Sequence, residues 1–251
     1  MNIVACVKRV PSTEAVAKPT ADGKGLDAAD FQYMISFYDE IAVEQAVQTK
    51  EAVGAGEVTV LTLGPANGTK EIRECLAKGG DKAVVLTDDN WQSRDARSTA
   101  KALVAQLSTM DADLVFMGRV ATDRDNAAVG PMVATYLGWP CVSDVIGLEV
   151  GDGKGTAKVE TEAGVETVEF SLPAVVTCQK GLNEPRYAGL KGIMAAKKKP
   201  LEEVAPEAVE NQSEVVEVAL PPARKEGRIV GEGAAAVPAL IEALQNEAKV
   251  L

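Results

Sequence analysis

Residues 57–65 read Glu-Val-Thr-Val-Leu-Thr-Leu-Gly-Pro, a run of β-branched and aliphatic residues that ends at a Gly-Pro pair. Such a run with a breaker behind it predicts a buried β-strand. The segment before it, from about Asp39 to Gly54, predicts a surface helix because its apolar residues recur on one helical face: Ile41, Val43, Ala46 and Val47. Residues 2–10 form another apolar run, which we interpret as the first strand. The beginning of the chain therefore predicts a strand-helix-strand unit.

The same alternation continues through the next hundred residues. We expect helices at 69–78 and 96–107, and strands at 82–86, 112–117 and 172–177. A parallel crossover needs a helix, and both faces of a parallel sheet must be buried. The pattern predicts an α/β fold: a doubly wound, mostly parallel sheet with helices on both faces. Residues 156–170 alternate around Ala163-Gly164 and predict an inserted β-hairpin.

The composition of the chain changes near residue 200. Residues 200–232 contain four prolines among many Glu and Val residues, and no compact core can be drawn from them. A final helix is expected at 234–249, with its apolar residues on one face: Val237, Leu240, Ile241 and Leu244. We therefore divide the chain into an α/β domain at 1–199 and an extended C-terminal arm with a helix at 200–251. An arm without its own core needs a surface to lie on, so a second chain is expected.

Composition excludes several classes of function for the 251 residues. The chain has no histidine, which removes Ser-His-Asp and Cys-His catalysis, so chemistry must come from a cofactor. A net charge of −11 argues against nucleic-acid binding. The four cysteines include no C-x-x-C pair, which argues against zinc sites and disulfides and favours a cytoplasmic protein. No apolar run is long enough for membrane insertion.

Four polar loops follow expected strands, at residues 8–13, 64–66, 87–89 and 118–130, where an open α/β sheet has its ligand crevice. The loop at 118–130 enters an expected helix at 127–137, whose first N–H groups could hold a phosphate. A polar loop without a ligand is the alternative. Asp123 and Asp125 could bind ribose hydroxyls or a metal, but we favour helix capping for at least one of them.

The segment at 182–199 carries apolar residues next to cations, namely Leu190, Ile193 and Met194. These side chains either form a partner-binding site or fold back onto the core of their own chain. The residues alone leave both readings open.

The string Leu-Asn-Glu-Pro-Arg-Tyr-Ala-x-Leu-x-x-Ile-Met-x-Ala-Lys-Lys-Lys at 182–199 resembles the signature of electron transfer flavoprotein beta subunits. Val-Lys-Arg-Val at 7–10, Asp-Glu-Ile-Ala-Val-Glu-Gln-Ala-Val at 39–47 and the loop at 118–132 agree in order and spacing. The resemblance covers essentially the whole chain. It implies an adenine-nucleotide alpha-hydrolase-like fold and an electron-carrier subunit that is not an enzyme on its own.

The resemblance also implies cofactors and partners. An alpha subunit would hold most of an FAD, and this chain would bind AMP. The implied nucleotide contacts are Cys6, Ser36, Phe37, Tyr38, Asp39, Leu63, Ala121, Thr122, Asp123, Arg124, Asp125, Asn126, Ala127, Ala128, Val129, Gly130, Pro131 and Met132. Tyr38 would also approach the flavin ring. The loop at 182–199 would be a recognition loop, in which Leu190, with Ile193 and Met194 beside it, docks onto acyl-CoA dehydrogenase-type flavoenzymes.

Departures from the family pattern keep an alternative open. The sequence Val129-Gly130-Pro131 resembles the electron-bifurcating branch, which binds a second FAD in place of AMP, whereas 183–187 and the triple lysine resemble the AMP branch. We favour AMP. A stand-alone nucleotide sensor resembling universal stress proteins is a candidate from another class, although it has no use for the arm. An autonomous flavin reductase is disfavoured because no G-x-G-x-x-G follows an expected strand.

Overall fold

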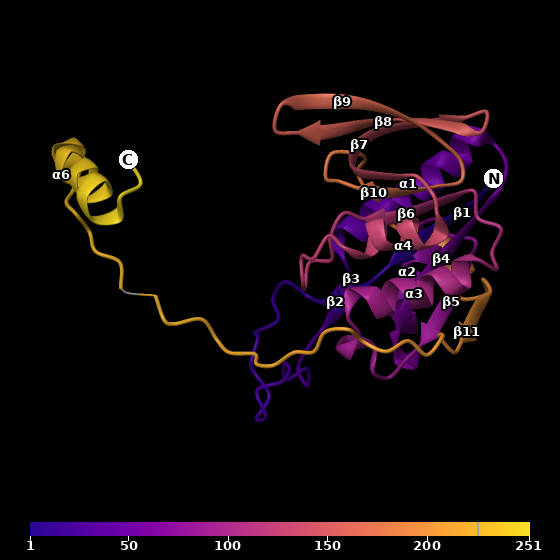
Figure 1. Cartoon of the computed structure of the whole chain (residues 1–251), viewed down its shortest axis with the longest axis horizontal. Helices are drawn as coiled ribbons and strands as arrows, with labels where there is room; N and C mark the ends of the chain where they lie inside the picture. The colour runs from indigo at the N-terminus through magenta and orange to yellow at the C-terminus, as the bar shows by residue number, and fades with distance from the viewer. Residues whose placement is uncertain (225) are drawn as a thin grey trace.

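The computed structural model describes residues 1–224 and 226–251. Among these, nine strands form one sheet in the order β11-β5-β4-β1-β6-β10-β7-β8-β9 (Figure 1). Their bounds are β1 (Asn2–Val7), β4 (Glu57–Gly64), β5 (Lys82–Thr87), β6 (Leu114–Gly118), β7 (Cys141–Gly151), β8 (Lys154–Thr161), β9 (Gly164–Ser171), β10 (Ala174–Cys178) and β11 (Leu201–Val204). All pairs from β11 to β7 are parallel, whereas β8 pairs antiparallel with β7, and β9 pairs antiparallel with β8. The predicted fold class and the predicted hairpin are confirmed.

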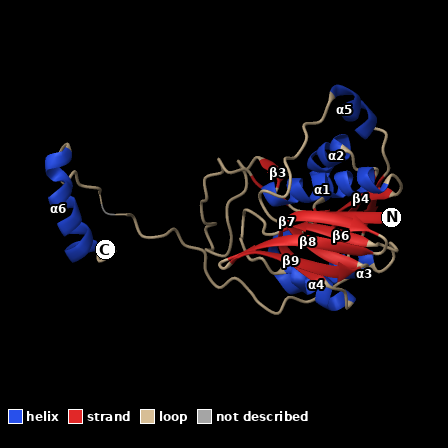
Figure 2. Cartoon of the chain, turned by 90° about the horizontal axis from the view of Figure 1, so that it is seen from above, coloured by secondary structure: helices blue, strands red, loops and turns tan. Residues whose placement is uncertain are grey.

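Helices cover both faces of the sheet. Figure 2 shows α1 (Phe37–Val53) and α2 (Thr69–Lys78) on one side, and α3 (Ala96–Leu107) and α4 (Val129–Leu137) on the other. The central strand β1 alternates between the two cores: Ile3 and Ala5 face α1 and α2, while Val4 and Cys6 face α3 and α4. Successive side chains point to opposite faces of the sheet, and both faces are buried. The parallel strands are therefore continuous apolar runs in the sequence.

The chain departs from the expected element bounds in two places. The first apolar run divides at residue 8, because β2 (Arg9–Pro11) leaves the main sheet and pairs with β3 (Tyr33–Ile35) in a separate antiparallel ribbon. The long strand β7 was not expected from the sequence. Its pattern is broken by Gly147, and its pairing with β8 shifts register between Val145 and Gly147.

The sheet extends past the expected domain boundary at residue 199. Strand β11 lies beside β5, with Leu201 against one core and Val204 against the other. The arm therefore begins after Val204. It leads to α6 (Val237–Glu242), which lies between a 3-10 turn (Ala234–Ala236) and a π-helical turn (Ala243–Ala248), so the predicted terminal helix is present.

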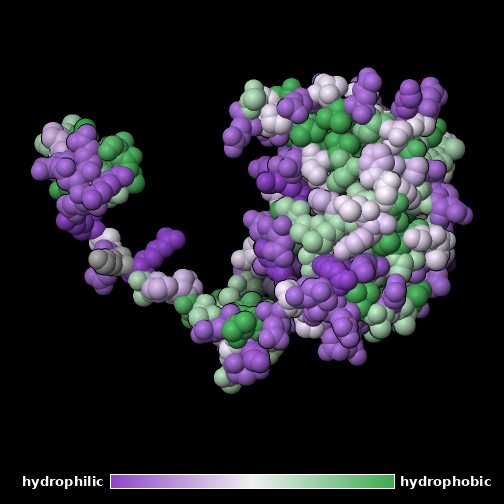
Figure 3. Space-filling model, in the orientation of Figure 1, coloured by the Kyte–Doolittle hydropathy of each residue, from purple (hydrophilic) through white to green (hydrophobic). Residues whose placement is uncertain are grey.

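Helix α6 stands away from the sheet (Figure 1), and apolar residues gather on one side of it (Figure 3). Val237, Leu240 and Ile241 are all exposed. None of the helices in the described parts of the chain combines the length and the apolar character that crossing a bilayer requires.

Candidate functional site

The carboxyl ends of β1, β4 and β6 lie side by side, at the edge where an open α/β sheet has its ligand crevice, and we call this edge the crevice. The N-terminus of α1 is fastened there by Asp39, whose carboxylate accepts the backbone N–H of Lys8 at 2.8 Å and that of Gly118 at 2.9 Å. A Cβ at position 118 would overlap this carboxylate, so a glycine is required. Asp39 therefore ties together the ends of β1 and β6.

Asp39 is a buried acid. Burial, the largest influence, raises its pKa to about 7, even though the two backbone N–H groups and the charge of Lys8 favour the ionised form. Asp123 adds a smaller raising effect. Asp39 therefore changes protonation near neutral pH.

The loop after β6 is anchored by Ser36 and Lys8. The fully buried Ser36 hydroxyl donates to the carbonyl of Val120 at 3.4 Å and accepts the N–H of Thr122 at 3.3 Å. The ammonium of Lys8 binds both carboxylate oxygens of Asp123 at 2.7 Å. The side chains of Ser36 and Asp123 therefore fix the conformation of the loop through contacts within the chain.

The expectation that Asp123 or Asp125 caps the following helix is wrong. Helix α4 begins at Val129, its N-cap residue is Ala128, and no side chain caps it. Asp123 lies five positions earlier and is occupied by Lys8, while Asp125 has a positive φ of 55° and its N–H donates to the carbonyl of Ala121. The expected start of this helix at residue 127 is also two residues early.

The uncapped start of α4 leaves backbone donors free. Ala127 has a φ of 50° and Ala128 a φ of −106°, an alternation of hand that turns successive N–H groups toward one side. Within the described residues, no acceptor is assigned to the N–H groups of residues 126–130. An alanine at positive φ costs about 1–2 kcal/mol, so this conformation points to a function. We call residues 126–130 the anion cradle.

The apolar floor of the crevice comes from strand ends and from α4. Cys6, Leu63 and Met117 are buried in the same core as Val129 and Met132. Burial raises the pKa of the Cys6 thiol far above its usual range, so this thiol stays neutral. Gly130 lies tightly against β10: a Cβ there would come within 2.7 Å of the Thr177 methyl group. The floor can contact an apolar ring but supplies no charge.

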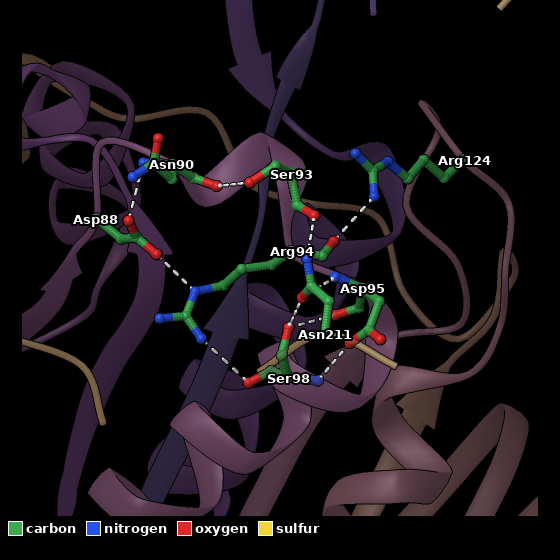
Figure 4. A network of polar contacts seen from close by, with 8 residues as sticks. All are labelled: Asp88, Asn90, Ser93, Arg94, Asp95, Ser98, Arg124 and Asn211. Carbon is green, nitrogen blue, oxygen red and sulfur yellow. Dashed lines mark hydrogen bonds and ion pairs between the residues drawn. The ribbon is translucent and has the colours of Figure 1, made fainter. Parts of the chain in front are cut away.

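One predicted contact residue, Arg124, has its side chain directed elsewhere. The guanidinium of Arg124 donates to the carbonyls of Gln92 and, at 3.1 Å, Arg94 (Figure 4). Phe37 is 40% exposed and meets Tyr38 edge to face at 5.3 Å between ring centroids. The structure thus brings together the backbone at 121–132 and the floor, whereas the side chain of Arg124 points away from the cradle.

The segment at 182–199 contains a short helix, α5 (Leu190–Ala196), and not an open loop. Leu190, Met194 and Ile193 are 78%, 57% and 45% exposed, so these side chains do not fold back onto the core of their own chain. We call α5 the docking helix, after the docking role that the sequence predicts for Leu190. Gly192 permits close packing: a Cβ at this position would overlap the Ala77 carbonyl of α2.

The docking helix is held by side chains that sequence reasoning did not single out. Arg73 of α2 donates to the carbonyls of Ala196 and Lys199 at 2.7 and 2.6 Å. Lys199 in turn donates to the carbonyls of Leu76 and Gly80 at 2.9 and 2.6 Å. These carbonyls lie at the ends of α5 and α2, where helices lack internal donors. The basic run ending at Lys199 was the only signal of this contact in the sequence.

The chain leading into α5 is fastened to α1 by Arg186. Its guanidinium binds Glu44 at 2.8 and 2.9 Å and Glu51 at 2.7 and 3.0 Å. Burial favours the neutral form of Glu44, but hydrogen bonds from Arg186 and from the Gln48 amide outweigh it and lower the Glu44 pKa. Bidentate pairs of this kind fix both distance and orientation.

The fold and these two regions define a doubly wound α/β protein with backbone N–H groups left without an acceptor at the start of α4 and an apolar helix exposed at the surface. Residues 26–209 match the family model of the electron transfer flavoprotein domain. The chain is 38% identical over its whole length to the electron transfer flavoprotein subunit beta of Syntrophomonas wolfei, covering 98% of that protein. It is 36% identical to the subunit beta of Bacillus subtilis and 37% identical to a mitochondrial subunit beta of Oryza sativa subsp. indica, covering both completely. The chain belongs to the electron transfer flavoprotein beta-subunit family.

Proposed function

We propose that this chain works as the beta subunit of a heterodimeric electron transfer flavoprotein, and that it is an electron carrier rather than an enzyme. It would pair with an alpha subunit that holds most of an FAD. It would accept electrons from acyl-CoA dehydrogenase-type flavoenzymes and pass them to a quinone reductase or another acceptor. Family membership over the full chain supports the carrier role. The exposed apolar face of α6 supports the alpha-subunit partner, because a monomer would leave it in water.

The anion cradle carries the second part of the proposal, which is that the chain binds AMP. Free N–H groups at the start of α4 suit a phosphate, and the helix dipole adds a favourable field. The floor of Cys6, Leu63 and Met117 suits the adenine ring. The residues present therefore fit a mononucleotide.

FAD would supply the electron-transfer chemistry. Tyr38, half-buried at the N-terminus of α1, is the residue that we assign to the flavin side of the crevice. Asp39 and Ser36 position the crevice walls through the strand-end and loop contacts described above.

Acid extraction of the purified heterodimer, followed by nucleotide chromatography, tests this proposal. We expect one FAD and one AMP per heterodimer. Two FAD and no AMP would support the bifurcating alternative, to which the sequence Val129-Gly130-Pro131 is similar. A chain that is a stable monomer and binds a nucleotide without any partner would support the sensor alternative and contradict the carrier role.

A matched pair of variants locates the nucleotide. Ala127→Glu adds a carboxylate at the cradle, which would repel a phosphate, whereas Ala127→Gln adds nearly the same volume without charge. We expect the Glu variant to lose most of its AMP and the Gln variant to retain clearly more. Equal AMP content in both variants would show that the phosphate lies elsewhere.

A further inference from the structure

A cavity of about 570 Å³ lies between α2 and the docking helix, outside the crevice. Its floor is apolar and is formed by Ala77, Ala188, Ile193 and Ala196. Figure 2 shows α5 as the outermost element on this side of the sheet, so the cavity opens next to the surface that carries Leu190. We call this cavity the α2–α5 groove.

The rim of the groove is basic, although the whole chain has a net charge of −11. Lys70 and Lys197 lie on the rim, are exposed, and have no ion-pair or hydrogen-bond partner assigned among the described residues. The other cations there are already used: Arg73 holds α5, and Lys78 pairs with Glu40 at 3.1 Å. Glu74 is the one acidic residue in the lining described.

The groove is built with fixed walls. Arg73 and Lys199 join α2 to α5 in both directions, and Arg186 fastens the preceding chain to α1. A groove whose walls are held in place loses little conformational entropy when a partner segment enters it.

We propose that the α2–α5 groove is a second part of the docking surface, and that it receives an acidic segment of the electron-donating flavoenzyme carrying apolar side chains. The proposal rests on the proposed function. Leu190 projects into the partner, while the partner projects into the groove. Continuity with the docking helix places the groove at the same interface, and the free cations at Lys70 and Lys197 select for carboxylates flanking the inserted side chain.

The test measures the Kd between the complete heterodimer and an acyl-CoA dehydrogenase for four variants, of which Leu190→Ala is the reference for the docking helix. Ala188→Trp fills the groove without changing charge and should raise the Kd about 10-fold or more. Lys70→Glu should raise it about 3- to 10-fold at low ionic strength, and less in high salt because exposed charges are screened. Lys154→Glu, an equal charge change at the exposed first residue of β8, is the control and should leave the Kd unchanged.

Leu190→Ala separates failure of the inference from failure of the proposed function. If Leu190→Ala raises the Kd but Ala188→Trp and Lys70→Glu do not, the groove is not part of the interface. If Ala188→Trp lowers heterodimer yield while the chain itself stays folded, the alpha subunit covers the groove and the inference is overturned. If the wild-type heterodimer neither binds the dehydrogenase nor accepts electrons from it, the proposed function itself fails. FAD content and thermal midpoint, measured for each variant, should match the wild type. Because Lys70 is exposed, Lys70→Glu tests the inference even if Ala188→Trp unfolds the chain.

Discussion

Asp39 shows how one residue combines a structural and an electrostatic task. It lies in the first turn of α1, and its carboxylate accepts N–H groups from the ends of two strands. The same burial that makes these hydrogen bonds valuable penalises the charge, so the pKa rises to about 7. Because the chain contains no histidine, Asp39 is the side chain with a resolved pKa shift that titrates between pH 5 and 8.

This raised pKa predicts a direction for stability. An unfolded aspartate loses its proton near pH 4, whereas folded Asp39 keeps it until about pH 7. Between about pH 4 and pH 7 the folded state therefore binds more protons than the unfolded state. The contribution of Asp39 to the free energy of unfolding is lost as the pH rises through 7. We expect the wild type to lose on the order of 2–3 kcal/mol between pH 5 and 8 from this group.

Urea denaturation at pH 5 and pH 8 checks this expectation. Asp39→Asn mimics the neutral carboxyl, so its free energy of unfolding should change much less between the two pH values. Asp89→Asn, which alters an exposed acid beside the crevice, should keep the wild-type dependence. An identical pH dependence in the Asp39 and Asp89 variants would contradict the assignment.

At the scale of elements, the arm is fastened to the start of α3. Asp95 caps α3 through the N–H of Ser98 at 2.7 Å and also accepts the N–H of Gln212 at 2.6 Å. Burial alone would raise the Asp95 pKa, but hydrogen bonds from Ser98, Gln212 and Ser213 lower it to about 2. Asn211 bridges Asp95, Ser98 and Ser93 (Figure 4), where Arg94 and Arg124 also meet.

Two variants should separate the cap from the arm. Asn211→Ala removes the arm's side-chain contacts but leaves the Asp95 cap, so amide hydrogen exchange should accelerate at residues 207–218 and stay unchanged in α3. Asp95→Ala should accelerate both and cost about 1–2 kcal/mol of stability through the lost cap. Hydrogen exchange read by mass spectrometry measures each segment; slow exchange at 207–218 in Asn211→Ala would show that the arm is held by other contacts.

At the scale of the whole molecule, the chain is a sheet domain followed by an arm that is attached for part of its length. Strand β11 completes the sheet, and the N–H of Val218 still donates to the carbonyl of Gly23 at 2.7 Å. Beyond this point the chain leads to α6 and its exposed apolar face. The sheet therefore extends to residue 204, and backbone contacts between the arm and the sheet domain continue to residue 218.

Two truncations test this division. A chain ending at residue 218 keeps β11 and should retain the wild-type thermal midpoint while losing the alpha subunit. A chain ending at residue 199 loses the β5–β11 ladder and the burial of Leu201 and Val204, and its midpoint should fall by roughly 5 °C or more. Differential scanning calorimetry measures the thermal midpoints of the two truncated chains. Equal midpoints would show that β11 does not unfold together with the rest of the sheet.

The sequence by itself determined the alternation of helices and strands in the first half of the chain, the doubly wound class and the family, because periods of 2 and 3.6 residues and a long specific motif are local properties of the chain. Only the tertiary structure decided which residues meet. The pairing of Lys8 with Asp123 joins positions 115 residues apart, and it engages one of the two carboxylates that local reasoning had considered for a helix cap. Strand β11 was also decided by the tertiary structure. Its four residues are too few to predict a strand from the sequence, and they form one because β5 supplies their hydrogen-bond partners. The exposure of Leu190 was likewise open until Gly192 packed on α2, since whether an apolar side chain is covered depends on neighbours that are distant in sequence.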